Sequence, residues 1–235
     1  MKMIETQVSW DAGFKNPSGP RLRFVKFEES SGADGHLTRY RVYAEGAQEG
    51  TPYILAFLKI GMLPENVQIL SNGAYVNRKG LLLTRRPARD EEDSQSVGGN
   101  AEFDLGLQAA NGEPVRFLLR SKDNKVMIPG TLVPFPIESA ENGCKLSAFL
   151  SAPEANIVLF YADGFPPNSE VVAEGNSAGE LKEGRHMTDG RGHARFIALP
   201  FVLGKDNGVL KESIRTKDCS VTVEVPWGKG SYRKH

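Results

Sequence analysis

The chain has 235 residues, of which 40% are hydrophobic, 25% charged and 9% aromatic. This composition is typical of a folded protein and argues against disorder along the whole length. The 29 Lys and Arg side chains balance 29 Asp and Glu side chains, so the formal net charge is zero. We therefore expect no nucleic-acid partner, because phosphate neutralisation requires concentrated Lys and Arg.

The N-terminal residues, from Met1 to Thr6, lack the apolar core of a secretory signal. The protein is then either cytoplasmic or exported with a signal that this sequence does not contain. A run of about 18 apolar residues is absent, so we expect no membrane-spanning helix. Residues 1–37 precede the internal repeat of the chain, and we interpret them as a leader strand of the first domain or as an N-terminal extension.

Short apolar runs with a period of two recur along the chain, whereas helical periodicity is almost absent. A period of two places the apolar side chains on one face of a β-strand, and a second sheet must cover that face. The clearest strands are predicted at 21–28, 102–108, 144–150 and 219–225. In the first of these the apolar phase shifts between Phe24 and Val25, which predicts a β-bulge. The predicted fold class is therefore all-β.

One pattern occurs twice: an apolar strand, a Gly, a Pro turn and a second strand. The first copy covers residues 53–67 and the second covers residues 156–171. The closing strands also correspond, since they end in Val-Pro-Phe and Val-Pro-Trp. The first copy is longer by a polar segment, residues 89–100, which we predict to be a mobile loop. The repeat predicts two tandem β-sandwich modules with one strand order, at residues 38–137 and 138–235, joined by a Pro-rich linker.

The second module carries a group of motifs with a recognisable order. They are the turn Gly164-Phe-Pro-Pro-Asn-Ser-Glu-Val171, the segment Thr188-Asp-Gly-Arg-Gly192, the pair Leu199-Pro200 and the last strand up to Trp227. This arrangement resembles bacterial immunoglobulin-like β-sandwich modules, most strongly over residues 144–228. The resemblance implies modules that serve secreted and cell-surface proteins as spacers, adhesive units or binding domains. It carries no catalytic residue onto this chain.

Candidate metal ligands occur at His186, Asp189 and His193, because two imidazoles and a carboxylate can bind a metal ion. The competing interpretation is a hairpin turn between two strands, built on the Gly-containing pairs of this segment. In such a hairpin the two His side chains lie on opposite strands and can meet. Neither a nucleophile elbow nor a nucleotide-binding loop is present, so we predict no catalytic residues and no cofactor.

Aromatic side chains are the candidates for partner contact, since exposed rings stack on sugars or anchor a protein partner. We select Tyr161, Trp227 and Tyr232, with packing in the core or at strand ends as the alternative. The partner is expected to be a protein or a glycan. The sequence does not define the oligomeric state.

The two cysteines, Cys144 and Cys219, lie on the apolar faces of strands at the beginning and end of the second module. They are predicted to face each other as a disulfide or to remain two buried thiols. A disulfide would indicate an oxidising compartment. The sequence thus favours an extracytoplasmic, non-catalytic pair of binding or spacer modules that contacts a protein or glycan through loops. The alternatives are a metal-dependent enzyme or metal-binding protein at His186, Asp189 and His193, and a structural subunit of a surface assembly.

Overall fold

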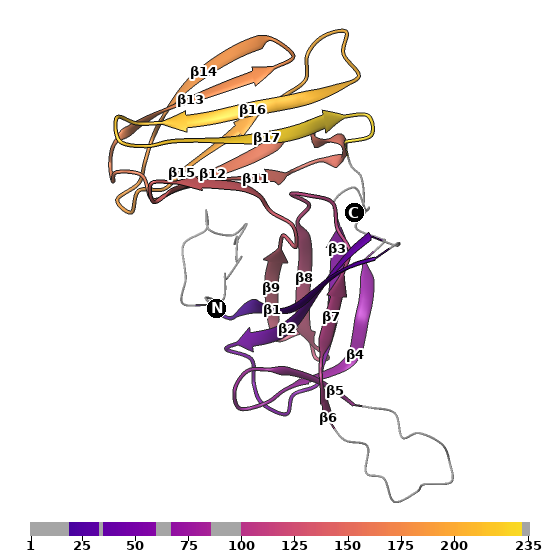
Figure 1. The fold of residues 1–235 in the computed structure, drawn as a ribbon. Helices are drawn as coiled ribbons and strands as arrows, with labels where there is room; N and C mark the ends of the chain where they lie inside the picture. Colours follow the sequence, from indigo (N-terminus) through magenta and orange to yellow (C-terminus); the bar gives the residue numbers. More distant parts are fainter. Residues whose placement is uncertain (1–18, 33–34, 60–66, 86–99, 232–235) are drawn as a thin grey trace, which may run out of the picture. The chain divides into compact units, whose positions relative to one another are not determined.

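The computed structural model describes residues 19–32, 35–59, 67–85 and 100–231, and the chain is almost entirely β (Figure 1). Within these ranges no helix is long and apolar enough to cross a membrane. The predicted loop at 89–100 lies outside the described residues, apart from its last position. The fold class predicted from the period-two pattern is confirmed.

The chain forms two compact units. One comprises Met1–Gln108 and Val115–Pro134, and the other comprises Ala109–Pro114 and Phe135–His235. The short segment Ala109–Pro114 belongs to the second unit through backbone hydrogen bonds. The amide of Gly112 donates to the carbonyl of Phe135, and its carbonyl accepts from the amide of Leu150.

The described residues of the first unit form nine strands in two sheets. The strands are β1 (Arg21–Gly32), β2 (Gly35–Glu45), β3 (Tyr53–Lys59), β4 (Gln68–Val76), β5 (Leu82–Arg85), β6 (Asn100–Glu102), β7 (Asp104–Leu107), β8 (Val115–Ser121) and β9 (Met127–Leu132). One sheet has the order β1-β2-β7 and the other the order β6-β5-β4-β3-β8-β9. The leading strand β1 is therefore an integral strand of this unit, paired along its length with β2.

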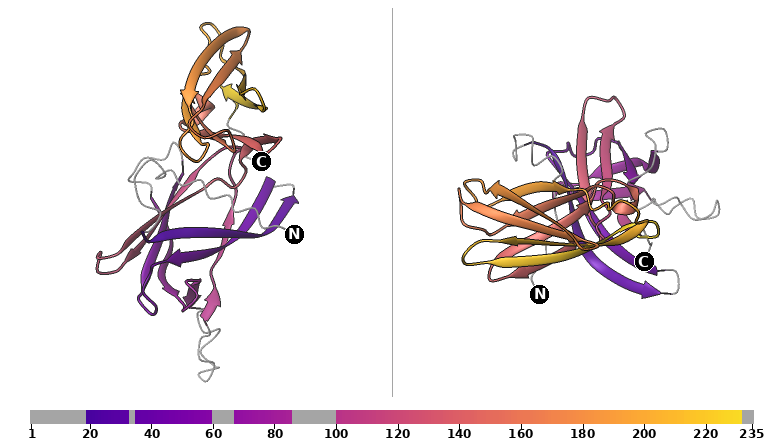
Figure 2. Two further views of the ribbon diagram at one scale, coloured as in Figure 1. Left: turned by 90° about the vertical axis from the view of Figure 1, so that its left-hand side faces the viewer. Right: turned by 90° about the horizontal axis from the view of Figure 1, so that it is seen from above.

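In the second unit, the part that the structure describes forms eight strands and one short 3-10 helix, η2 (Pro153–Ala155). The strands are β10 (Ile137–Glu141), β11 (Cys144–Leu150), β12 (Val158–Asp163), β13 (Glu170–Ser177), β14 (Glu180–Met187), β15 (Ala194–Ala198), β16 (Asn207–Arg215) and β17 (Ser220–Gly228). The sheets have the orders β10-β11-β12-β15 and β14-β13-β16-β17. Figure 2 shows the long β13–β14 hairpin (orange) from two further sides.

Five strand pairings of the first unit have an equivalent in the second. The sheet β1-β2-β7 corresponds to β11-β12-β15, and the run β4-β3-β8-β9 corresponds to β14-β13-β16-β17. All of these pairings are antiparallel in both units. The units differ at their margins, because the first adds β5 and β6 beside β4, and the second adds β10 beside β11.

The sequence alignment of residues 53–67 with residues 156–171 is therefore wrong. The sequence match equates β3 with β12, but β3 pairs with β4 and β8, whereas β12 pairs with β11 and β15. The topological equivalent of β3 is β13. An apolar strand followed by Gly and Pro describes both a hairpin within one sheet and a crossing between sheets, so the motif does not fix the strand order.

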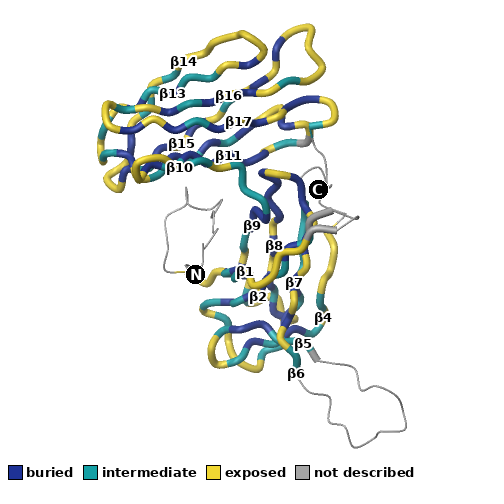
Figure 3. The backbone as a smooth tube through the Cα atoms, in the orientation of Figure 1, coloured by how far each residue is buried: buried dark blue, intermediate teal, exposed yellow. Residues whose placement is uncertain are grey.

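The predicted β-bulge is also displaced. The register of β1 against β2 shifts between Lys26 and Glu28, three residues after the predicted position. Leu22 and Phe24 remain on the buried face, and the exposed Phe27 carries the irregularity. The alternation in burial along the other strands is visible in Figure 3.

Candidate functional site

The segment between β14 and β15 forms a tight turn that joins the two sheets of the second unit. Asp189 Oδ1 accepts from the amides of Arg191 at 2.8 Å and His193 at 2.9 Å. Hydrogen bonds from His193 and Arg191 lower the pKa of Asp189. The buried hydroxyl of Thr188 donates to the carbonyl of Pro166 at 2.6 Å. Hydrogen bonds of Thr188 and Asp189 therefore determine the shape of the turn between β14 and β15.

The candidate metal ligands do not all meet. His193 lies between two carboxylates, with Nε2 3.1 Å from Asp163 and Nδ1 3.5 Å from Asp189. His186 instead stacks on Phe196 at a centroid distance of 4.7 Å. The expected hairpin is not formed, because β14 and β15 belong to different sheets, so the two His are not opposed. Among the described residues, no three His, Cys, Asp or Glu side chains are arranged to hold a metal ion.

The three candidate aromatic contacts have different surroundings. Tyr161 is half-buried beside His193 and the guanidinium of Arg195, and burial raises the pKa of its phenol. Trp227 is 2% exposed and lies edge-on to Phe201, so it offers no open ring face. Tyr232 lies outside the described residues.

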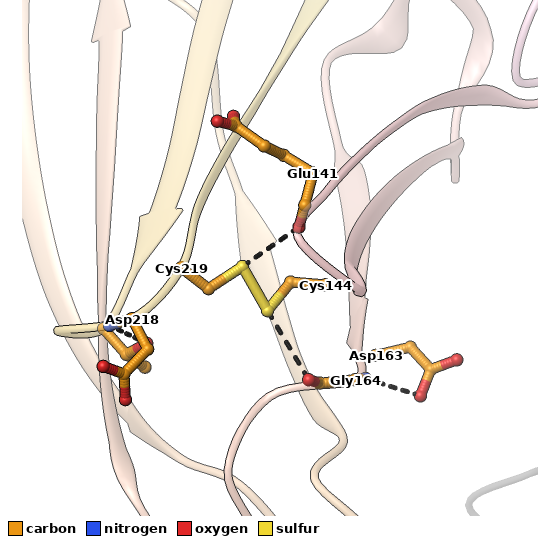
Figure 4. The surroundings of a disulfide bond; sticks show 7 residues. Glu141, Cys144, Asp163, Gly164, Asp218 and Cys219 are labelled. Carbon is orange, nitrogen blue, oxygen red and sulfur yellow. Dashed lines mark hydrogen bonds between the residues drawn. A yellow bond between two sulfur atoms is a disulfide. The ribbon is translucent and has the colours of Figure 1, made fainter.

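Cys144 and Cys219 form a disulfide with a Cα–Cα distance of 6.4 Å (Figure 4). Cys144 begins β11, and Cys219 directly precedes β17, so the bond joins the two sheets of the second unit. It closes a loop with a sequence separation of 75. The two half-cystines are buried in the core between the sheets.

A groove of about 340 Å³ opens between the two sheets on the side where β14 and β15 form the edges. Its walls are formed by side chains of β13, β14, β15 and β16. One end is closed by Ser177, whose buried hydroxyl donates to the carbonyl of Pro200 at 2.6 Å. The turn between β14 and β15 lies at the other end. We call this opening the Glu212 groove, after the side chain in its floor.

Glu212 occupies a position on β16 that a sandwich normally fills with an apolar residue. The buried positions of this strand alternate as Leu210, Glu212 and Ile214. Glu212 is 4% exposed, and its carboxylate lies over Gly175 of β13, where an added Cβ would come within 2.6 Å of Oε2. Across the described residues, no donor forms a hydrogen bond with this carboxylate, and its oxygens border the groove instead of being fully enclosed by protein.

Burial, with a smaller contribution from the charge of Glu174, raises the pKa of Glu212 to about 7. A carboxylate without hydrogen bonds is costly to bury, since the protein does not replace the water that solvates it in the unfolded chain. The groove wall adds Glu180, Lys182 and Glu183 from β14, with His186 above Phe196. Glu183 is paired with Arg185 and Arg215, but Glu180 and Glu212 still outnumber Lys182 around the opening, so the groove favours a cation.

The equivalent strand of the first unit contains no such charge. The buried positions of β8 are Val115, Phe117, Leu119 and Ser121. The first unit therefore builds its interior from apolar side chains at this place, and the glutamate is specific to the second unit. The strand order that the two units share therefore does not require a glutamate at the position of Glu212.

One sequence signal points to Glu212. Over residues 210–214 the positions of one face are Leu210, Glu212 and Ile214, so a glutamate stands in the apolar phase. Such an interruption indicates a buried charge when the strand is central in its sheet. The strand order was needed to show that β16 is central and that its interior side meets an opening.

Comparisons with known proteins give no match: no protein-family model fits the chain, and no curated protein is significantly similar to it. The candidate site is therefore interpreted from its own geometry and chemistry.

Proposed function

We propose that this chain is a non-catalytic, extracytoplasmic binding protein made of two immunoglobulin-like sandwiches, and that its second unit binds a positively charged side chain of a partner protein in the Glu212 groove. The observation that carries the proposal is a buried carboxylate without a hydrogen-bond donor that borders an open groove. A Lys or Arg side chain supplies the donor that the fold omits. The proposal places partner recognition between the sheets rather than in the loops.

The immunoglobulin-like assignment is supported by the strand order. When β11–β17 are lettered A, B, C, C′, E, F and G, one sheet holds A, B and E and the other holds C′, C, F and G. The same lettering applies to β1, β2, β3, β4, β7, β8 and β9 of the first unit. Sandwiches of this class share two aligned antiparallel sheets with such crossings. A duplication of one module accounts for both units.

The extracytoplasmic assignment is supported by the disulfide between Cys144 and Cys219. Disulfides form and persist in oxidising compartments and are rare in the cytosol. A secreted or cell-surface binding module also suits the neutral charge balance of the chain.

A cationic side chain matches the groove better than the other candidate ligands. Its aliphatic stem can lie against Phe196 and Ala198, which face the groove from β15, while its charged end reaches Glu212. Charge-assisted hydrogen bonds are the strong ones, and here one removes an unmet desolvation cost. A glycan is less well matched, because the ring of Trp227 is buried.

Selection from a randomised heptapeptide phage library on the whole chain tests the proposal. We expect the selected peptides to carry Lys or Arg at one fixed position. They should bind the Glu212→Gln variant at least tenfold more weakly than the wild type, the loss of about 1.4 kcal/mol or more that one charge-assisted hydrogen bond supplies.

The matched control is Glu224→Gln, which removes the same charge from the exposed outer side of β17. It should leave peptide binding unchanged. Selection without enrichment of basic residues, or equal binding by wild type and Glu212→Gln, overturns the proposal.

A further inference from the structure

The edge strand β15 offers a partner a surface along which it can approach the groove. It is the last strand of its sheet and pairs only with β12 among the described strands. An edge strand has backbone amides and carbonyls free along one side, and these can pair with an added strand. Its outward-facing residues include Ile197, which is 62% exposed, and Leu199 follows at 59%. This edge therefore combines unpaired backbone with exposed apolar side chains.

In the first unit, β5 and β6 extend the sheet beside β4, the equivalent of β14, and Leu81 forms a bridge to Tyr43 of β2 in the other sheet. The carbonyl of Leu82 in β5 accepts from the amide of Phe103, which lies between β6 and β7. On the other side of this corner, Ala44 of β2 donates to the carbonyl of Gly80. Leu81 and Leu82 are buried there. Backbone hydrogen bonds thus connect the two sheets of the first unit beside β4, whereas in the second unit β14 is an edge strand that borders the Glu212 groove.

From the free edge of β15 and the buried carboxylate of the neighbouring groove, we propose that a partner of the second unit adds an extended strand beside β15, with a Lys or Arg side chain directed into the groove toward Glu212. This inference rests on the proposed function, since it supplies the backbone geometry by which the cationic side chain arrives. Strand addition provides affinity through main-chain hydrogen bonds and specificity through alternate side chains.

The strand is assigned to β15 and not to β14 because the two edges differ. The side of β14 that faces the groove carries Glu180, Lys182 and His186, and charges that point inward from an edge strand obstruct pairing with other chains. Figure 3 shows β14 exposed along most of its length. The groove-facing residues of β15 are small or apolar, namely Phe196 and Ala198.

A second copy of this chain does not supply the required side chain. Paired at this edge, another β15 would direct Ala194, Phe196 and Ala198 inward, and none of them is basic. The carboxylate of Glu212 would stay unmatched. The charge of the groove therefore selects a different protein with a basic residue on the inward side of an extended segment.

The test uses the synthetic heptapeptide Thr-Val-Thr-Lys-Thr-Val-Thr, blocked at both ends, with the whole chain. Two further versions carry backbone N-methyl groups, one on the odd and one on the even positions. Only alternate amides of an added strand face β15, so one methylated version should lose at least tenfold in affinity while the other binds like the parent. Hydrogen exchange at amides of β15 should slow when the parent peptide binds.

The possible failures are distinguishable. Equal binding by the parent and both methylated peptides, or loss in both, overturns strand addition. If the parent binds no better than a peptide with central Gln, cation recognition fails and the strand inference fails with it. Sedimentation of the chain alone provides a third outcome, since a dimer that dissociates in the Ile197→Lys variant would assign this edge to a second copy and overturn the inference.

Discussion

Replacing Glu212 by Gln should change the pH dependence of stability in a way that a solvent-exposed glutamate cannot. The substitution retains the shape of the side chain over Gly175 but removes its titration. The folded state holds the carboxyl with a pKa of about 7, against an ordinary value of 4.5. Because the pKa is raised on folding, the folded state binds the proton more tightly than the unfolded chain does.

The sign and size of the effect follow from this difference. Below pH 4.5 the carboxyl is protonated in both states and adds no pH dependence. As pH rises toward 7, the unfolded chain ionises first, and the folded state loses stability relative to it. The difference of 2.5 units between about 7 and 4.5 corresponds to roughly 3 kcal/mol at 1.36 kcal/mol per unit. Above pH 7 the wild type should therefore carry a penalty of that order, which Glu212→Gln lacks.

Urea denaturation followed by the fluorescence of Trp227 provides the assay, in a background where Trp10 is replaced by Phe. Trp227 is buried in the second unit, so its signal reports the unit that contains Glu212. The free energy of unfolding is measured for both variants from pH 4.5 to pH 8.5. Across this range, the free energy of unfolding of Glu212→Gln should increase by about 3 kcal/mol relative to that of the wild type. The cost of burying the amide in the Glu212→Gln variant does not depend on pH, so it does not contribute to the change in the difference between the two proteins.

The other titratable groups around the opening are Glu174 on β13 and Glu180, Lys182, Glu183 and His186 on β14. They are present in both variants and largely cancel in the comparison. Glu224→Gln, on the exposed side of β17, should follow the wild type at every pH. A gap between Glu212→Gln and wild type that stays constant to within about 0.5 kcal/mol would refute the reasoning, because it would mean that the carboxyl is solvated in the folded state.

Two further predictions concern the frame around the groove. Removal of the disulfide by Cys144→Ala with Cys219→Ala should lower the free energy of unfolding of the second unit, by at most about 4.5 kcal/mol for a loop of 75 residues in the chain-entropy model; unchanged urea midpoints would contradict it. Gly192→Ala should destabilise this unit by roughly 2 kcal/mol more than Gly179→Ala, because both have positive φ but only the first would place Cβ 2.0 Å from the carbonyl of Phe165. Equal losses in the two alanine variants, measured by urea denaturation, would show that the turn relaxes without cost.

The fold class could be predicted because burial on one face of a strand imposes a period of two on the sequence. Strand pairing could not, since it depends on which edges meet after the chain turns. The residues around Gly61 and Gly164 illustrate this limit: similar motifs precede β4 and β13, which pair differently with the strands before them. The closing strands β9 and β17 were matched correctly because they hold the same place in both units.

The candidate site was harder to predict, for a physical reason. His186 and His193 attract attention as metal ligands, yet one stacks on an aromatic ring and the other pairs with carboxylates. Glu212 has an ordinary sequence context, and its significance comes from burial and from the opening beside it. Both properties depend on contacts between strands that are distant in sequence.

The most direct test of the central claim is the pKa of Glu212 itself, followed by carboxyl carbon NMR with and without the lysine heptapeptide. In the free protein the pKa should be about 7. A bound ammonium group stabilises the carboxylate, so saturation with the peptide should lower the pKa by one unit or more. The peptide with central Gln should leave it unchanged. A pKa that stays the same when the lysine peptide binds would contradict the account, because the cation would then lie somewhere other than beside Glu212.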